Sequence, residues 1–198
     1  MKKIALVIAG MFLVTGAYAQ SRLEWGAKAG LNLAGQMAKS CGGFGISDVR
    51  PAIYAGFFAE YAIGRRTGLQ SELVYSMQGA GDRRGTRTLI EQLDYINIPI
   101  LFKYYVNRKR SISIDAGPQF GYLIRTKYKG WEGTEKGYSL NKFDLSLGLG
   151  VTFRPDSQLD FGFRVIGGAT EIGKTRTGGC DSSDNRNFVV QIGAGFRF

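Results

Sequence analysis

The sequence predicts an all-β fold, an eight-stranded antiparallel up-and-down transmembrane β-barrel. The last eleven residues alternate apolar side chains with small or polar ones, which is typical of a strand whose two faces meet different environments. The first nineteen residues combine Lys2 and Lys3, an apolar run and the small-residue site Ala17-Tyr18-Ala19, which is typical of a cleavable export signal. An exported chain of amphipathic strands suits the bacterial outer membrane, where a closed barrel pairs every backbone amide.

The chain of 198 residues is long enough for one domain. We expect a signal peptide over residues 1–19 and one barrel domain over residues 20–198. The apolar run of the signal, Ile4–Val14, is shorter than the roughly 20 residues that a membrane-spanning helix needs. The organisation predicts an exported, monomeric outer-membrane protein.

Eight alternating segments account for most of the mature chain, each close to the roughly 9–11 residues of a tilted membrane strand. They are Trp25–Leu33, Ala52–Ile63, Gly68–Gln78, Leu93–Tyr105, Ile112–Arg125, Lys142–Arg154, Leu159–Ile166 and Asn187–Phe198. Short connections centre on Gly64–Arg66, Asn107–Lys109 and Pro155–Ser157. Long connections are expected over Ala34–Arg50, Gly79–Gln92, Thr126–Asn141 and Gly167–Arg186. Because short turns are periplasmic in such barrels, both termini are predicted on the periplasmic side.

The apolar face of these strands is predicted to meet lipid. Its side chains are bulky, and the interior of an eight-stranded barrel has little room for them. The opposite face is rich in glycine, which we interpret as space for a few long polar side chains. If the sixth segment were turned over, Lys142 and Asp144 would face lipid, and a lysine near the bilayer midplane costs about 2–4 kcal/mol.

The polar face predicts a charge network that closes the lumen near its periplasmic end. Its members are Lys28, Glu60, Glu72, Lys103, Asp115, Arg154, Asp160, Arg164 and Arg197. Lys103 with Asp115, and Arg154 with Asp160, flank short turns and are expected to pair across strands. Glu60 and Glu72 are expected to be neighbours across the Gly64 turn, with Arg164 or Lys28 as their counter-ion.

Several segments resemble the PorT-like family of small outer-membrane barrels, which is common in Bacteroidetes. Leu69–Gly79 (LQSELVYSMQG) resembles the third-strand motif of that family, and Tyr95–Leu101 (YINIPIL) resembles the next strand. The resemblance covers nearly all of the mature chain and implies an eight-stranded outer-membrane barrel, with some members linked to protein secretion. It implies no catalytic residues. Asn97 stands where the family pattern leads us to expect a carboxylate.

The two cysteines and an aromatic loop residue are candidate sites outside the barrel wall. Cys41 lies in the first long connection and Cys180 in the last, and closure of the barrel makes these connections neighbours. Because export passes through an oxidising compartment, a Cys41–Cys180 disulfide is predicted, with free or differently paired thiols as the alternative. Trp131 lies among lysines in the third long connection and is a candidate for loop recognition. The terminal Phe196 and Phe198 are interpreted as the signal for the barrel-assembly machinery.

The composition excludes several classes of function. The chain has no histidine, so Ser-His and Cys-His nucleophiles and imidazole zinc sites are excluded, and we expect no enzyme and no cofactor. The formal net charge is +10, and the basic residues behind it lie in loops, in turns and on one strand face. We therefore expect lipopolysaccharide or another surface polyanion as the partner, and no nucleic acid. The predicted function is envelope structure or loop-mediated binding at the cell surface. An accessory role in a secretion machine and a narrow pore for small solutes remain as alternatives.

Overall fold

The computed structural model describes residues 22–40, 43–46, 49–84, 87–129, 141–170, 173–177 and 180–198. The predicted signal peptide, Cys41 and Trp131 lie outside these residues. In the described part of the chain no helix is long and apolar enough to cross a membrane.

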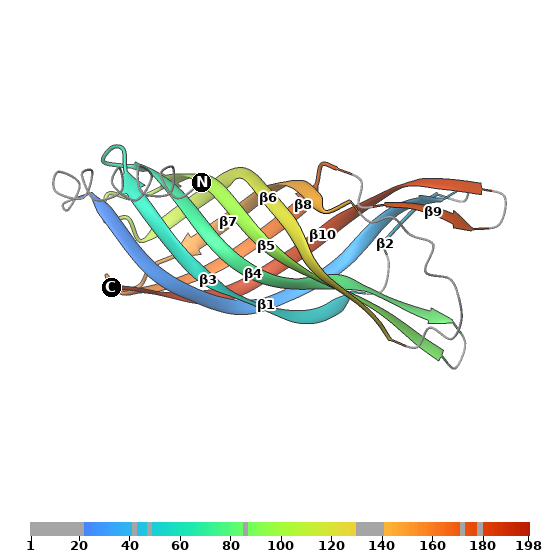
Figure 1. Ribbon diagram of the computed structural model, residues 1–198. Coiled ribbons are helices and arrows are strands. Elements are labelled where there is room, and N and C mark those ends of the chain that lie inside the picture. Colours follow the sequence, from blue (N-terminus) through green and yellow to red (C-terminus); the bar gives the residue numbers. More distant parts are fainter. Residues whose placement is uncertain are drawn as a thin grey trace, which may run out of the picture.

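The described residues form ten strands, eight of which are long and make the wall of a closed barrel (Figure 1). The wall strands are β1 (Leu23–Ser40), β3 (Arg50–Ala62), β4 (Thr67–Arg84), β5 (Arg87–Tyr105), β6 (Ile112–Lys129), β7 (Phe143–Phe153), β8 (Leu159–Gly168) and β10 (Cys180–Arg197). Two short strands, β2 (Gly43–Ile46) and β9 (Gly173–Thr177), add to the ends of β1 and β10. Each wall strand contains or closely matches one predicted segment, so the predicted fold class is confirmed.

The barrel closes through β1 and β10, which pair antiparallel from Gly26 opposite Arg197 to Met37 opposite Arg186. The remaining wall strands pair with their sequence neighbours, also antiparallel. Every wall strand therefore has two partners over its central part, which satisfies the backbone amides that meet hydrocarbon.

One end of the barrel has short turns and the other has long strand extensions (Figure 1). The prediction of long loops at the second end was wrong in part, because β4 and β5 continue as a paired hairpin up to Arg84 opposite Arg87. β1 likewise continues to Ser40, and β10 begins at Cys180. A search for alternating apolar and polar residues does not find these extensions, because a strand outside the bilayer has no lipid-facing side that must be apolar.

The two faces of the wall are those expected from the alternation. Large apolar side chains lie exposed on the outside, such as Phe57 with 64% and Leu147 with 63% of its surface accessible. Charged side chains of the opposite face are almost fully buried, with Glu60 and Lys103 each at 1%. The apolar exterior and the charged interior together make this a transmembrane barrel.

The glycine-rich wall accommodates aromatic as well as polar side chains. A Cβ at Gly193 would lie 2.3 Å from the hydroxyl oxygen of Tyr54, and a Cβ at Gly26 would lie 2.7 Å from the ring of Phe58. Arg164 instead lies over Gly148 and Gly150. On the β7 side of the lumen the glycines make room for a polar side chain, as expected. At the β1–β10 seam they make room for the aromatic rings of Tyr54 and Phe58 instead.

The prolines within strands interrupt the hydrogen-bond ladder without shifting it. Pro99 has no ladder partner on β4, although the pairing on either side keeps one register. The irregular register of β5 against β6 lies between Asp94 and Tyr95 instead. The wall tolerates the missing hydrogen bonds at Pro99 because β5 stays paired with β4 before and after this position and also stays paired with β6.

Candidate functional site

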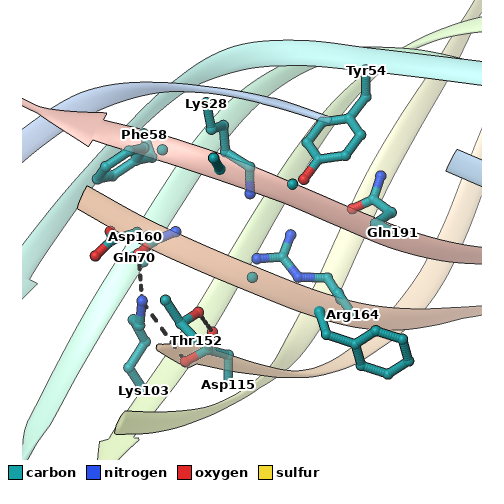
Figure 2. A pocket seen from close by; sticks show the side chains of 15 residues that line it. Lys28, Tyr54, Phe58, Gln70, Lys103, Asp115, Thr152, Asp160, Arg164 and Gln191 are labelled. Carbon is teal, nitrogen blue, oxygen red and sulfur yellow. Dashed lines mark hydrogen bonds and ion pairs between the residues drawn. The ribbon is translucent and has the colours of Figure 1, made fainter. Parts of the chain in front are cut away.

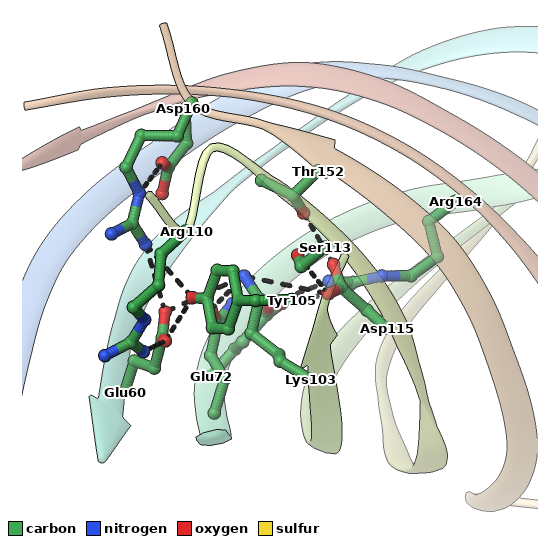
Figure 3. A network of polar contacts seen from close by, with 12 residues as sticks. Glu60, Glu72, Lys103, Tyr105, Arg110, Ser113, Asp115, Thr152, Asp160 and Arg164 are labelled. Atoms are coloured by element: carbon green, nitrogen blue, oxygen red, sulfur yellow. Dashed lines mark hydrogen bonds and ion pairs between the residues drawn. The ribbon is translucent and has the colours of Figure 1, made fainter. Parts of the chain in front are cut away.

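The inner faces of the strands bring all nine predicted charged residues into the lumen, near the short-turn end. Figure 3 shows six of them: Glu60, Glu72, Lys103, Asp115, Asp160 and Arg164. Each lies within about six residues of a strand end on that side. Antiparallel hairpins with short turns force this arrangement, because inward positions close to a turn on one strand face inward positions close to the same turn on the next.

Glu60 is the anion of the first cluster. Its carboxylate accepts hydrogen bonds from Arg197 Nη2 at 2.7 Å, Arg110 Nη2 at 2.6 Å and Arg154 Nη2 at 3.4 Å. The hydroxyl of Tyr105 donates to the same carboxylate. Charge-assisted bonds of this number satisfy a carboxylate that is buried away from water.

Asp160 joins the two arginines of this cluster from the other side. It accepts from Arg197 Nε at 2.9 Å and from Arg154 Nε at 3.0 Å. Glu24, at the start of β1, accepts from Arg154 Nη1 at 3.4 Å and from Arg197. The chain ends that meet at the barrel seam are thereby tied to β7 and β8.

Glu72 is the anion of the second cluster, one step deeper in the lumen. Arg164 donates to both of its carboxylate oxygens, at 3.0 and 2.9 Å, in a forked arrangement. Lys28 Nζ donates to Oε2 at 2.8 Å, and the amide of Gln70 donates to Oε1 at 2.6 Å. Side chains from β1 and β8, neither of which is paired with β4, therefore converge with Gln70 of β4 itself on one carboxylate.

Lys103 links the two clusters. Its ammonium donates to Gln70 Oε1 at 2.9 Å and lies 3.7 Å from Glu60 and 3.8 Å from Asp115. Asp115 also accepts from the hydroxyl of Thr152 at 2.5 Å (Figure 3). The pairs that flank short turns, Lys103 with Asp115 and Arg154 with Asp160, thus lie in contact.

Glu60 and Glu72, predicted to be neighbours across the Gly64 turn, lie diagonal to each other and not directly opposite. Glu60 lies opposite Gln70, whereas Glu72 lies opposite Phe58. The two glutamates are offset by two positions along the hairpin, and each has its own cations. Arg164 and Lys28, the predicted counter-ions of the pair, contact Glu72.

Four members of the network were missed from the sequence: Glu24, Gln70, Tyr105 and Arg110. Gln70 and Tyr105 share the inward alternation of Glu72 and Lys103, so the same period-2 count would have found them. Arg110 lies in the turn 106–111 with a positive φ of 57°, where no alternation applies. Burial alone would lower the pKa of Arg110, but Tyr105 and Glu60 raise it, so the guanidinium stays charged.

The lumen beside these clusters holds a cavity of about 40 Å³, which has room for about three water molecules (Figure 2). Lys28, Tyr54, Lys103, Arg164 and Gln191 line it together with the seam glycines. Glu60 and Glu72 are both engaged with cations, so neither is poised as a general base. Within the described ranges no group of acidic or sulfur ligands is arranged to hold a metal ion.

In the outer half of the lumen the donors are mainly neutral, even where they reach the buried carboxylates Asp94 and Asp144. Asn32 donates to Ser76 Oγ at 2.9 Å and to the Met77 carbonyl at 2.8 Å, and it accepts from Gln191 at 2.9 Å. Asn97 Nδ2 is buried with no hydrogen-bond partner among the described residues. Small apolar clusters lie at the same depth, formed by Leu93, Tyr95 and Leu123 and by Ala34, Ile166 and Val189.

A shallow groove of about 660 Å³ lies at the outer rim, where β7 begins and β8 ends beside β10. Its lining combines two exposed cations with an aromatic ring and polar groups: Asn141, Lys142, Phe143, Ala169, Thr170 and Arg186. Thr170 anchors one wall, because its hydroxyl accepts from Leu145 N at 2.9 Å and donates to Asp144 Oδ1 at 3.0 Å. The sequence missed this groove because its two cations lie 44 positions apart on strands that meet only in the folded barrel.

The remaining predicted site residues fall at the chain end or outside the described part. Phe198 packs against Trp25 with ring centroids 4.6 Å apart and against Phe196 at 5.6 Å, on the lipid-facing side of the seam. Their role as an assembly signal stays a prediction. The partner of Cys180 and the role of Trp131 also stay predictions, since Cys41 and Trp131 lie outside the described residues.

Comparison with known families identifies the architecture. The model of the outer membrane protein beta-barrel domain matches residues 18–169, which is most of the chain. The chain belongs to this family. It is therefore an integral protein of the outer membrane, in agreement with the predicted location. No match was found among curated proteins.

Solved structures with a similar fold come from surface proteins of other bacteria. Ail, the attachment invasion locus protein of Yersinia pestis, has a TM-score of 0.51 and 14% identity, covering 89% of this chain and 99% of its own. A second structure of Ail, in complex with the heparin analogue sucrose octasulfate, has a TM-score of 0.51 and 15% identity, with the same coverage. Neisserial surface protein A has a TM-score of 0.52 and 13% identity, covering 89% of this chain and 97% of its own. At these identities the likeness concerns the fold alone.

Proposed function

We propose that this chain is a non-enzymatic outer-membrane barrel with a sealed lumen, which binds anionic glycans of the cell surface at its outer rim. The rim groove is the observation that carries the proposal. It places Lys142 and Arg186 beside Phe143, and cations next to an aromatic ring suit sulfated or phosphorylated sugars. The lipopolysaccharide of the surrounding leaflet is the ligand of this chemistry that the barrel meets first.

Two further observations support the proposal. The lumen is crossed by two ion clusters with a cavity of about 40 Å³ between their side chains, which favours a sealed barrel over a solute pore. The similar barrel of Ail is described in complex with a heparin analogue, which is a polyanionic sugar. The finer features belong to the same proposal: membership of the PorT-like subgroup, a cleaved signal over residues 1–19, and loops that carry Trp131 and a Cys41–Cys180 disulfide.

Binding of sucrose octasulfate and of purified lipopolysaccharide to the detergent-solubilised protein tests the groove. We expect K142Q/R186Q to weaken binding by about tenfold or more, because two charge-assisted contacts are lost. R125Q/K127Q is the matched control, since it removes two exposed cations from β6 at the same rim. Equal losses in both variants would mean diffuse attraction by charge, and the groove would then not be the site.

Planar-bilayer recordings test the sealed lumen. The wild-type protein is expected to give no large, stable conductance while a general porin reconstituted in parallel does. A steady conductance would favour the alternative of a narrow pore. A protein that co-purifies stoichiometrically from the native envelope under mild detergent would instead favour the accessory role in secretion.

A further inference from the structure

The short-turn end of the barrel exposes a cluster of basic side chains that neither the lumen network nor the rim groove uses. Its members, here called the periplasmic arc, are Arg22, Arg65, Arg66, Arg108 and Lys109. All five are exposed. Among the described side chains of the turns at this end, Asp156 is the exposed carboxylate.

Backbone hydrogen bonds make these residues contiguous around one side of the rim. Ala62 N donates to the carbonyl of Arg22, which places the start of β1 beside the turn 63–66. Tyr105 N donates to the carbonyl of Arg66, which places that turn beside the turn 106–111. The arc therefore runs over the ends of β1, β3, β4, β5 and β6, whereas Asp156 lies in the β7–β8 turn.

Both turns are tight, so the cations stay close to the strand ends. Gly64 N donates to the carbonyl of Thr67 at 3.0 Å, and Val106 N donates to the carbonyl of Ile112 at 3.0 Å. Asn107 Oδ1 accepts from Ser111 N at 2.9 Å, which fixes the second turn from within. Neither turn reaches far into the periplasm.

The residues next to these cations mark the edge of the apolar belt. Leu23, Ile63 and Val106 each adjoin an arc turn and expose 44%, 50% and 51% of their surface on the outside of the wall. These apolar side chains are stable in the hydrocarbon layer, so they mark its periplasmic boundary. The arginines and lysines next to them then lie at the depth of the lipid phosphates, which long basic side chains reach by snorkelling.

We propose that the periplasmic arc binds the phosphate headgroups of anionic phospholipids in the inner leaflet of the outer membrane. Guanidinium groups match phosphate oxygens in a forked geometry, and five cations along one arc offer sites for more than one phosphate. The shortness of the turns favours headgroups in the membrane plane over a carboxylate polymer farther into the periplasm. The proposal does not depend on what the outer rim binds.

The experiment compares lipid selection by the full-length mature protein and two variants of matched charge. R65Q/R66Q neutralises the centre of the arc, and R125Q/K127Q removes two exposed cations at the outer rim that do not line the groove. Each protein is incubated with mixed micelles of phosphatidylglycerol and phosphatidylcholine, and retained lipids are counted by native mass spectrometry. Heat-modified migration on gels verifies that each variant is folded.

We expect the wild type and the outer-rim variant to prefer phosphatidylglycerol, and the arc variant to lose that preference by at least about fivefold. Raising the salt concentration is expected to reduce the preference as well. An unchanged preference in the arc variant, or an equal loss in both variants, overturns the proposal. Arc-dependent sedimentation with purified peptidoglycan, without any lipid preference, overturns it in favour of a cell-wall contact.

Discussion

The two halves of the lumen are built from different chemistry. The half near the short turns is crossed by ion pairs centred on Glu60 and Glu72. In the outer half the donors are mainly neutral: Asn32 contacts Ser76 and Gln191, and the buried carboxylates Asp94 and Asp144 accept from amides and hydroxyls. Breaking a buried ion pair costs about 3–5 kcal/mol, because the remaining charge is left without a partner. Losing one neutral hydrogen bond costs about 0.5–1.5 kcal/mol.

The difference shows which end of the barrel is held firmly. The charged half ties non-adjacent strands together across the lumen, at the end where β1 begins and β10 ends. The neutral half leads into the rim groove, where the sequence can change at lower cost in stability. The same division separates the ion clusters at the short-turn end from the rim groove that we propose as the binding surface.

Removing the deeper carboxylate is the strongest test of this comparison. Glu72→Gln keeps the shape but leaves Arg164 and Lys28 facing a neutral amide, so the free energy of unfolding is expected to fall by about 3–5 kcal/mol. Gln191→Leu in the neutral half is expected to cost about 1–2 kcal/mol. Urea unfolding in phospholipid vesicles measures both, and similar losses would show that the two halves do not differ in strength.

The geometry of the plug is tested next by Arg164→Lys. An ammonium keeps the charge but cannot donate in a fork to both oxygens of Glu72, so we expect a loss of about 1.5–3 kcal/mol. Lys28→Arg is the comparison variant, because Lys28 makes one contact with Glu72 Oε2 and keeps its charge in the exchange. If Arg164→Lys unfolds at the wild-type urea concentration, charge alone holds Glu72 and the forked contact is unimportant.

The sequence predicts the face of each strand and the pairs beside short turns well, for a physical reason. Lys103 with Asp115 and Arg154 with Asp160 follow from counting outward from a turn, because a short hairpin fixes its own register. Glu24 with Arg197 and Glu60 with Arg197 join positions 173 and 137 residues apart. Their meeting depends on barrel closure and strand tilt, which no local pattern records.

The same reasoning explains the errors. A symmetric count about the Gly64–Arg66 turn places Glu60 opposite Gln70, as observed, so Glu72 lies diagonal to Glu60 at the next inward position of β4. Alternation alone puts both side chains on the inner face and does not distinguish a direct pair from a diagonal one. The strand extensions beyond the membrane and the rim groove likewise lie where lipid imposes no pattern on the sequence.

Packing density should also differ between the halves, and glycine substitutions measure it. Gly193→Ala would bring a Cβ within 2.3 Å of the Tyr54 hydroxyl and 2.5 Å of the Ala29 carbonyl oxygen, so we expect a loss of about 1–3 kcal/mol. A Cβ at Gly167, in the outer half, would have no atom within 4 Å, so Gly167→Ala is expected to change stability by less than about 0.5 kcal/mol. Loss of the heat-modified gel band for Gly167→Ala but not for Gly193→Ala would reverse the comparison.

Within the charged half, the smallest effect is expected at Arg110, because the Glu60 cluster keeps other cations when this one is lost. Glu60 keeps Arg197 and Arg154 when Arg110 is removed, so no buried charge is left alone and Arg110→Ala should cost no more than about 1 kcal/mol. Arg110 also has a φ of 57°, a left-handed conformation that costs an L-residue roughly 1–2 kcal/mol and costs glycine little. Arg110→Gly should therefore unfold at a urea concentration no lower than Arg110→Ala, although both lose the same contact with Glu60. A loss as large as that of Glu72→Gln would mean that the Glu60 cluster depends on each of its cations, as the Glu72 cluster does.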